Sequence, residues 1–323
     1  MGDRKRRQHY VFQGYLKEWT NNNHLFLFDK FDRKIRKADP KSILFKNCFY
    51  EINPLSENAK LFLNNLFEKL KIHPLNKIQL SETIELTQRT IFFDSSLEYL
   101  SNAANQINDQ SLKKSIDKSI IFSTNLIEEF HQYFEKIGSK LLLNLKNGDC
   151  DFYYKYDDEF NNFLFFFSLQ HTRTQKNRIN AIQIVNSLCE KNKIQPQLNE
   201  DEIKSVAFYM QFFLSSTLAT FFKHNKVHLT IIKNKTPLSF YTSDQPVFSL
   251  QKKDSQKDDY IYFYPISPTV AITVNDHNKD TIWEIDDINR IKNLNEQIVK
   301  NALRFVISIN EKDLNDLCKS NSY

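Results

Sequence analysis

The sequence predicts an α+β fold with a mainly helical core and a small antiparallel sheet. In residues 54–225, apolar side chains recur at the spacing of helices, whereas residues 226–310 hold short β-branched and aromatic segments separated by turn residues. Residues 1–53 contain two more strand-like segments. We therefore expect a single α+β domain over residues 1–323, in which N-terminal strands join the C-terminal sheet.

The N-terminal region begins with a basic tip, which is followed by an aromatic anchor. Residues 10–19 carry two tyrosines and a tryptophan, and we expect a short helix here despite Gly14. The asparagine run at residues 21–23 ends it. Residues 24–31 and 42–52 are rich in aromatic and branched side chains, which predicts two strands.

The middle of the chain predicts a series of helices. Residues 113–147 keep apolar positions at a period of roughly 3.6 over the longest stretch, and Asn147 with Gly148 closes this helix. The other helices expected here are residues 54–72, which end at His73 and Pro74, two helices that begin at Ser81 and Ser95, and residues 199–224.

Residues 160–178 form the stretch around which the chain is organised. Apolar side chains cover nearly every face of its first half, so we expect a buried helix whose basic continuation runs to about Lys191. The apolar stripe then leads to Gln170 and Arg173, which must find partners if they point inward. They are the first site candidates. The alternative is a helix end that emerges into solvent, where basic residues favour the negative end of the helix dipole.

The C-terminal third predicts an antiparallel meander. Its short segments are VHLTIIK, LSFYTSD, YIYFYPI and TVAITV, and they are separated by asparagine, aspartate and proline signals. Asp286 and Asp287 are placed to cap a following helix. Residues 304–309 predict a last strand.

Composition excludes several classes of site. The chain has only four glycines and no glycine-rich phosphate-binding motif, and its net charge of +5 permits contact with nucleic acid without requiring it. The four cysteines are scattered, so neither a zinc ribbon nor a disulfide framework is indicated. No stretch has the length of uninterrupted apolar sequence of a membrane span. We expect a cytoplasmic protein that does not contact a membrane, and the sequence leaves its oligomeric state open.

Two segments at opposite ends of the chain offer polar groups for chemistry. His9 and Tyr10 precede the aromatic anchor, which could hold the imidazole in place for acid–base work. Ser243 and Asp244 follow a predicted strand, and Asp244 could meet Arg173 or a metal ion. The alternatives are an exposed histidine near the terminus and a Ser–Asp pair that caps a turn through the backbone.

The longest predicted helix carries Glu128, His131 and Glu135 on one face. This spacing resembles that of metal ligands in helical carboxylate sites, but such a site needs a second matching motif, which the sequence lacks. A solvated charged face is the alternative explanation.

Five motifs occur together in the order and spacing of a bacterial family. They are HYVFQGYLKEW, IEEFHQYFEKI, FFFSLQHTRTQKNR, YTSDQPV and YPISPTVAI, and with them the chain resembles the family catalogued as "domain of unknown function 4238" over nearly its whole length. Phe12 and Gln175 replace prolines of the family's pattern. The resemblance implies a polar set drawn from distant segments: His9, Tyr10, Glu135, Gln170, Arg173, Ser243, Asp244 and Asn295. Members of the family resemble accessory proteins of mobile elements and anti-phage defence.

The leading hypothesis from the sequence is a defence-type effector that cleaves RNA. In it His9 is the general acid or base and Arg173 stabilises the phosphate, while Asp244 and Glu135 orient these residues or hold a divalent metal ion. The residues expected to bind substrate are Tyr10, Gln170, Ser243 and Arg178. The alternative is a non-catalytic module that recognises a phage or partner protein, with the polar set as a buried network. An enzyme acting on nucleotides or on a protein side chain is a third option.

Overall fold

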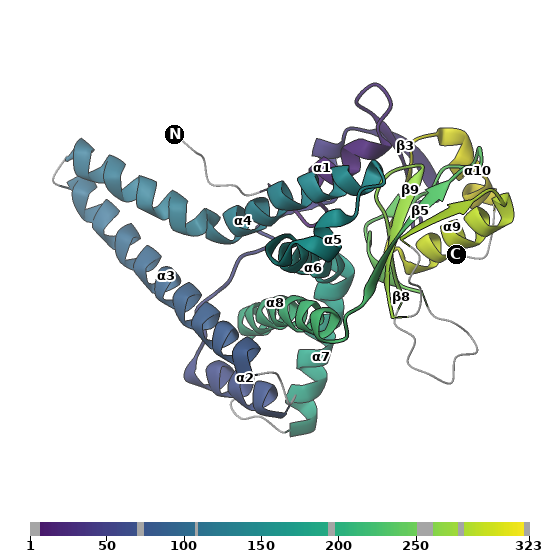
Figure 1. Ribbon diagram of the computed structural model, residues 1–323. Coiled ribbons are helices and arrows are strands. Elements are labelled where there is room, and N and C mark those ends of the chain that lie inside the picture. The colour runs from purple at the N-terminus through teal and green to yellow at the C-terminus, as the bar shows by residue number, and fades with distance from the viewer. Residues whose placement is uncertain are drawn as a thin grey trace. The chain divides into compact units, whose positions relative to one another are not determined.

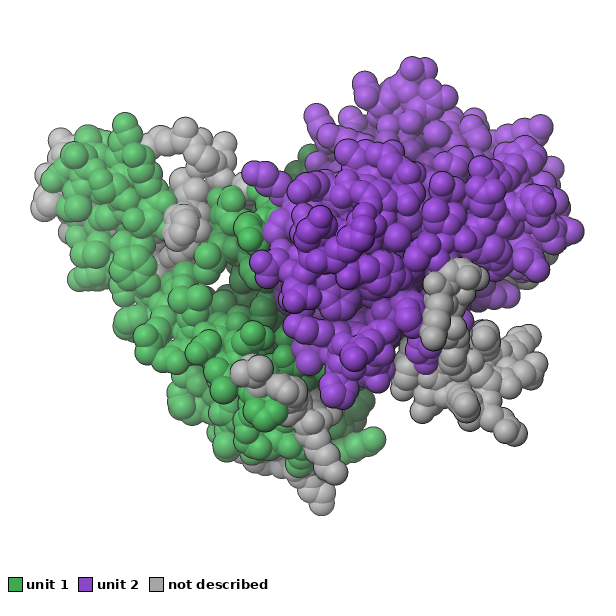
Figure 2. All heavy atoms as spheres, viewed as in Figure 1, with its two compact units in different colours: residues 1–8, 46–133, 177–217 green, residues 9–45, 134–176, 218–323 purple. Residues whose placement is uncertain are grey.

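A computed structural model of the protein describes residues 7–69, 74–106, 109–192, 198–250, 261–276 and 281–319 (Figure 1). The α+β class expected from the sequence is confirmed. The chain divides into two compact units, shown in different colours in Figure 2. Unit 1 comprises residues 1–8, 46–133 and 177–217, and unit 2 comprises residues 9–45, 134–176 and 218–323.

Unit 1 is built from helices around its own apolar core. Its helices are α2 (Glu57–Lys69), α3 (Pro74–Gln106), the first part of α4 (Gln110–Lys146), most of α7 (Gln175–Asn192) and the first part of α8 (Glu200–His224). The buried side chains of its core include Phe62, Leu63, Tyr209 and Phe213. α3 is one continuous helix where the sequence predicted two. The expected start of the second helix, Ser95, lies within α3 and does not interrupt it.

The helix boundaries follow local signals. α3 starts at Pro74, a residue that tolerates the first helical position because it has no N–H to leave unpaired. α4 ends where predicted: Gly148 adopts a φ of 85°, and its N–H donates to the carbonyl of Leu145 (3.0 Å). α8 is long and apolar enough for a membrane span, but 56% of its apolar window is buried within the protein, as in a core helix.

Unit 2 contains two sheets. A five-stranded sheet has the order β10-β5-β9-β8-β7 and draws only on the C-terminal third. Its strands are β5 (His228–Asn234), β7 (Phe248–Ser249), β8 (Ile261–Pro265), β9 (Val270–Asn275) and β10 (Ile282–Ile285). Strands β5, β9 and β8 pair antiparallel as expected. The sequence did not predict β7, which pairs antiparallel with β8, or β10, which pairs parallel to β5. The strand expected within LSFYTSD is β6 and belongs to the other sheet.

The second sheet joins the two ends of the chain, as the sequence predicted. Its order is β3-β2-β11-β6, with β2 (Leu25–Asp29), β3 (Lys34–Ala38), β11 (Phe305–Ser308) and β6 (Thr242–Ser243). β11 pairs antiparallel with both neighbours, and Val306 lies opposite Phe28 on one side and Ser243 on the other. This pairing places the Ser243–Asp244 segment beside the C-terminal strand.

Short elements connect the N-terminal region to unit 2. β1 (Arg7–His9) pairs with β4 (Phe45–Asn47), so the strand expected over residues 42–52 is much shorter than predicted. The aromatic anchor forms α1 (Gln13–Leu16) and a 3₁₀ turn, η1 (Lys17–Trp19), and a second 3₁₀ turn is η2 (Pro40–Ser42). The indole N–H of Trp19 donates to the carbonyl of Phe240 (2.9 Å), which holds the anchor in the core.

The Phe-rich helix predicted as the core is α6 (Asp157–Thr172), which follows the short α5 (Asp151–Lys155). Its rings Phe163, Phe166 and Phe167 are fully buried. Phe167 packs edge-on against Tyr264, with ring centroids 6.0 Å apart. α6 therefore supplies the buried scaffold on which the polar residues at its end are fixed.

The C-terminal part adds α9 (Ile288–Asn301) and α10 (Glu311–Lys319), of which the sequence predicted only α9. The carboxylate of Asp287 accepts from the N–H of Asn289 (2.9 Å), as the capping signal indicated. Ile291 and Ile298 of α9 and Leu314 of α10 are buried in the core of unit 2.

Candidate functional site

The end of α6 places Arg173 inside unit 2. The N–H of Arg173 donates to the carbonyl of Leu169 (3.0 Å), and α7 begins at Gln175. Arg173 is 4% exposed and Thr174 is fully buried. The helix expected to continue through these residues is therefore broken at them. Arg173 and Thr174 both have partners outside α6 and α7: Arg173 pairs with Glu135, and the hydroxyl of Thr174 donates to the side chain of Gln245.

Arg173 forms an ion pair with Glu135 of α4. Nη2 of Arg173 lies 2.7 Å from Oε1 of Glu135, and the two side chains are 3% and 18% exposed. Removing one partner of a buried ion pair typically costs about 3–5 kcal/mol, because the other charge is left buried. At this distance the carboxylate of Glu135 can hold the guanidinium of Arg173 in one orientation. Of the two side chains, that of Glu135 is the more exposed to solvent.

Two tyrosines adjoin this ion pair. Burial raises the pKa of Tyr264, Arg173 acts to lower it and Glu135 to raise it, so the phenol lies within electrostatic range of both charges. The ring of Tyr15 lies 5.1 Å from that of Tyr264, centroid to centroid. The hydroxyl of Tyr15 hydrogen-bonds the hydroxyl of Thr242. Burial also raises the pKa of Tyr15.

Three buried polar atoms near the end of α6 and on β8 make no hydrogen bond within the described part of the chain. They are Oγ of Ser168, Oε1 of Gln170 and the hydroxyl of Tyr264. These residues are at most 1% exposed. Gln170 lies one helical turn before Arg173 and so on the same face of α6. Folded proteins satisfy most buried polar groups, so a group left unsatisfied marks a place where water, an ion or a ligand group can complete the set.

The segment of residues 242–245 is sealed in the interior and contacts the end of α6. The side-chain amide of Gln245 donates to the carbonyls of His171 (3.0 Å) and Val247 (2.8 Å), and its oxygen accepts from the hydroxyl of Thr174. The hydroxyl of Ser243 accepts from the N–H of Gln245 (3.1 Å), a turn of the kind proposed as the alternative for this motif. Ser243 is fully buried.

Asp244 binds backbone. Its carboxylate accepts from the N–H groups of Leu303 (2.9 Å), Arg304 (2.8 Å) and Phe305 (3.0 Å). Burial raises the pKa of Asp244, and these three hydrogen bonds and Lys30 act against that rise. The carboxylate thus ties residues 242–245 to β11 and has its acceptor sites occupied, which is the backbone-capping alternative for this motif.

Tyr10 lies beside Asp244. Burial raises the pKa of Tyr10, Asp244 raises it further, and Arg304 acts to lower it. Two half-buried lysines also face Asp244, and both donate to carbonyls at the end of α9: Lys30 to Val299 and Ala302 (2.9 and 3.0 Å), and Lys176 to Asn301 (2.7 Å). The two lysine charges are stabilised there by the negative C-terminal end of the α9 dipole.

His9 is half-buried at the end of β1. The amide nitrogen of Gln13 lies 2.8 Å from Nε2 of His9, and the imidazole lies 5.6 Å from the ring of Phe45 between centroids. These contacts hold the imidazole through the aromatic anchor, as the sequence suggested. The structure thus brings Arg173 together with Glu135, and Tyr10 together with Asp244.

Arg178 belongs to unit 1, whereas the other predicted site residues belong to unit 2. Nη1 of Arg178 donates to Oε1 of Gln211 (3.2 Å), and its guanidinium lies 5.6 Å from the ring centroid of Phe208. Burial lowers the pKa of Arg178 to about 10, so the side chain keeps its charge at neutral pH. It therefore acts as a buried cation in the core of unit 1.

The structure adds residues that sequence reasoning missed. Tyr15, Thr242 and Tyr264 all lie within or beside motifs already singled out, but their hydroxyls carried no spacing signal. Asn295, the last member of the implied polar set, accepts from the N–H of Tyr241 (2.9 Å) and donates to the carbonyl of Ser239 (2.9 Å). It fixes the loop before β6.

The described residues offer no cluster of three or more histidine, cysteine, aspartate or glutamate side chains that could hold a metal ion. His131, one of the residues with metal-ligand spacing, stacks on Tyr50 with ring centroids 4.3 Å apart. Its place in the described structure is a packed aromatic contact.

The model of a protein family described as "Protein of unknown function (DUF4238)" matches residues 7–312 of the chain. The chain belongs to this family. No curated protein and no solved structure matches it. The family's motifs, as they stand here, meet in unit 2: the N-terminal motif reaches residues 242–245 through Tyr15, and the end of α6 reaches them through Thr174.

Proposed function

We propose that this protein is a cytoplasmic, defence-type effector that cleaves RNA, with a centre at Arg173, Glu135 and Tyr264. The observation that carries the proposal is the set of buried polar atoms on α6 and on β8, among them the hydroxyl of Tyr264 near this ion pair, that lack hydrogen bonds within the described residues. A purely structural network would satisfy them, because each one costs about 1–3 kcal/mol. A bound phosphate ester would accept a hydrogen bond from the hydroxyl of Tyr264.

Arginine at this centre favours an anionic ligand. Its planar guanidinium binds phosphate through paired N–H groups and stabilises charge that develops on the phosphate oxygens. Glu135 holds the guanidinium in one orientation through the 2.7 Å contact. The defence-type role rests on the motifs that the chain shares with the family.

The proposed reaction is attack of the RNA 2′-hydroxyl on the adjacent phosphorus. The new P–O bond forms as the bond to the 5′ oxygen breaks, and His9 takes the 2′ proton and returns it to the leaving oxygen. This chemistry needs no metal ion, and a divalent ion that neutralises phosphate remains compatible with it. Tyr10 and Gln170 would contact the substrate.

A tyrosine pair tests the proposal. Tyr264→Phe removes a hydroxyl with no hydrogen bond in the described structure, so the thermal midpoint should stay unchanged or rise slightly while RNA cleavage falls about 10- to 100-fold. Tyr153→Phe is the matched control. The hydroxyl of Tyr153 donates to the carbonyl of Val227 (2.8 Å), so its loss should lower stability by about 1 kcal/mol and leave cleavage intact.

Cleavage is measured on labelled single-stranded RNA with purified protein and as RNA integrity after induced expression in a bacterial host. If wild type leaves RNA intact in both assays, or if Tyr264→Phe cleaves as well as wild type, the nuclease proposal is wrong. A pattern in which Arg173→Ala lowers the midpoint sharply and no variant affects RNA would assign the ion pair to the core.

A second candidate function is a non-catalytic module that recognises a phage or partner protein. The burial of residues 242–245 favours it: Thr242 and Ser243 are fully buried and Asp244 and Gln245 are 2% exposed. Under this proposal the polar set maintains the fold, and function resides in the surface. Growth arrest or phage resistance that persists in Tyr264→Phe would support it.

A further inference from the structure

α3 carries a row of large apolar side chains on one face. Leu86, Phe93 and Leu100 are 59%, 55% and 49% exposed. They are spaced seven residues apart, which is the spacing that keeps side chains on one face and forms the seam of helix pairs. Soluble proteins rarely leave a continuous row of this kind in water unless another surface covers it.

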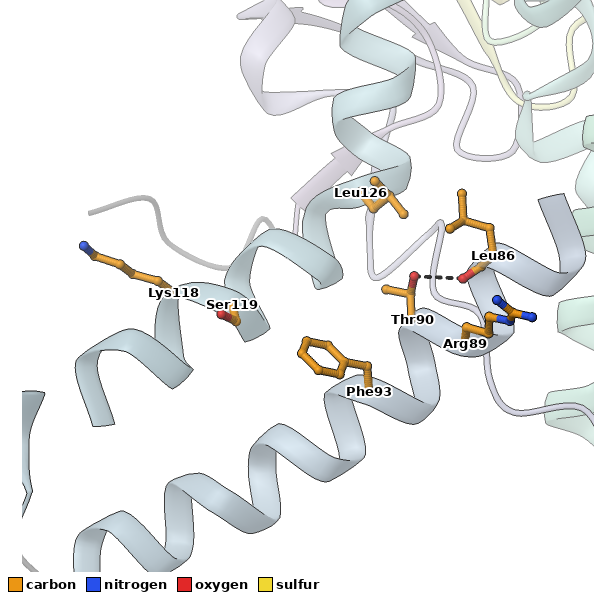
Figure 3. A pocket seen from close by; sticks show the side chains of 7 residues that line it. All are labelled: Leu86, Arg89, Thr90, Phe93, Lys118, Ser119 and Leu126. Carbon is orange, nitrogen blue, oxygen red and sulfur yellow. Dashed lines mark hydrogen bonds between the residues drawn. The ribbon is translucent and has the colours of Figure 1, made fainter. Parts of the chain in front are cut away.

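A groove accompanies this row. Toward the end of α3 and the start of α4, Leu97 and Ile116 pack together and are buried. Further along, the two helices flank an open groove of about 640 Å³, which Leu86, Arg89, Thr90 and Phe93 line from α3 and to which α4 also contributes Lys118. Figure 3 shows these side chains across from Ser119 and Leu126 of α4. The two helices thus pack together at Leu97 and Ile116, and the groove lies open at Leu86 and Phe93, where a further helix can approach.

We propose that this groove is the interface with a second copy of the chain, in which α3 of each copy packs antiparallel to α3 of the other with the two-fold axis beside Phe93. Leu86 and Leu100 lie at equal distances from this residue along α3, and so do the hydroxyl residues Thr90 and Ser96. Leu86 of one copy meets Leu100 of the other, and Thr90 meets Ser96. A two-fold interface needs such a self-complementary surface, and an unrelated partner does not.

The charges on this face permit the pairing. Arg89 of α3 lines the groove and forms an ion pair with Glu85 of the same helix, so its charge has a partner within its own copy. Among the described side chains of the row, no two like charges oppose each other in this register, so these side chains need no counter-charge from another partner.

The area is sufficient for a dimer. Leu86, Phe93 and Leu100 are flanked by Phe92 and Tyr99, which are both 76% exposed. Together these five side chains expose roughly 600 Å² per copy, taking about 150–250 Å² for each aromatic side chain. A standard interface buries about 800 Å² per partner, so these five side chains supply most of that area.

The oligomeric state of the full chain tests the interface. In sedimentation equilibrium, wild type should behave as a dimer and Phe93→Arg as a monomer, because the substitution sets two like charges against each other on the axis. Leu143→Gln is the matched control, since Leu143 is a 52% exposed leucine of α4 in unit 2. It should remain a dimer with an unchanged thermal midpoint, and Phe93→Arg should also keep its midpoint.

Disulfide trapping tests the register. In a background with serine at Cys48, Cys150, Cys189 and Cys318, protein with Leu86→Cys should crosslink to protein with Leu100→Cys and not to itself. Phe93→Cys should crosslink to itself. A wild type that stays monomeric at its highest soluble concentration overturns the proposal. A dimer that survives Phe93→Arg, or Leu86→Cys crosslinking to itself, overturns it equally, because the interface then lies elsewhere or the helices run parallel.

Discussion

At the scale of single residues, buried carboxylates connect segments that are distant in the chain. Asp244 accepts three backbone N–H groups from the start of β11, and Asp29 accepts from Arg304 at the same place. Each carboxylate is surrounded by donors, and this is what permits a charge in the interior. The candidate ion pair of Arg173 and Glu135 follows the same rule, but atoms beside it remain without hydrogen bonds.

Asp244→Asn should lower the free energy of unfolding by about 3 kcal/mol, because the amide replaces one acceptor oxygen with a donor that faces backbone N–H groups. Asp287→Asn is the control. Asn caps helices as well as Asp, so this exposed cap of α9 should keep wild-type stability. Chemical denaturation measures both, and equal stability of the two variants would contradict the capping role of Asp244.

The carboxylate of Asp29 makes the free energy of unfolding depend on pH. Burial alone raises its pKa, but hydrogen bonds from Arg304 and from the N–H groups of Phe31 and Asp32 outweigh burial and hold the pKa below its usual 3.8. A carboxylate with a lowered pKa in the folded state contributes stability that is fully present above the unfolded pKa and is lost as the pH falls through the folded value.

The stability difference between wild type and Asp29→Asn should therefore be constant above about pH 5 and shrink below about pH 4, as the wild-type carboxylate takes up a proton. Urea denaturation at a series of pH values measures it. A difference that is the same at about pH 3 and pH 7 would show that the charge of Asp29 contributes nothing.

At the scale of elements, the close approach of α4 and α6 positions the candidate centre. Gly138 of α4 lies against the ring of Phe166 in α6, and a Cβ at this position would overlap that ring. Phe166 is fully buried and has no free space to move into. Glu135 lies one turn from Gly138, so the spacing of the two helices also sets the distance to Arg173.

Gly138→Ala should destabilise the protein by about 1–3 kcal/mol, because the extra methyl group forces α4 and α6 apart. It should also reduce RNA cleavage under the proposed function, since Glu135 then withdraws from Arg173. Ser139→Ala is the control at the neighbouring exposed position and should be neutral. Thermal unfolding measures the stability of both variants. If Gly138→Ala is as stable as wild type, the ring of Phe166 moves aside and the close approach of α4 and α6 does not depend on Gly138.

At the scale of the whole molecule, unit 2 is closed by strands from both ends of the chain. β2 lies between β3 and the C-terminal β11, and Phe28 and Val306 face each other in this pairing. Both side chains are in the core of unit 2. The C-terminal third therefore lacks a central strand of its second sheet when residues 9–45 are absent.

A chain without residues 9–45 should lose the cooperative unfolding transition of unit 2, because β11 loses β2 and its apolar face loses its cover. Co-expression of residues 1–45 as a separate piece should restore the transition. Circular dichroism during heating measures both. A cooperative transition in the shortened chain would show that the five-stranded sheet and α9 are sufficient by themselves.

Local signals in the sequence predicted much of the fold. The apolar spacing of α4, the glycine after it, the cap at Asp287 and the Phe-rich α6 all act within a few residues, so the sequence shows them directly. The same signals failed at α3, where two helices were expected, and at β10 and α10, which were not predicted. Tertiary contacts override weak local preferences at such places.

For the candidate site, the sequence by itself determined which polar residues stand next to apolar ones, and so marked Arg173, Asp244 and His9 for attention. Only the tertiary structure decided their partners. Arg173 meets Glu135, whereas Asp244 meets the backbone of β11. The physical reason is that a hydrogen bond or ion pair between distant segments depends on how helices and strands pack, and no spacing within one segment encodes that distance.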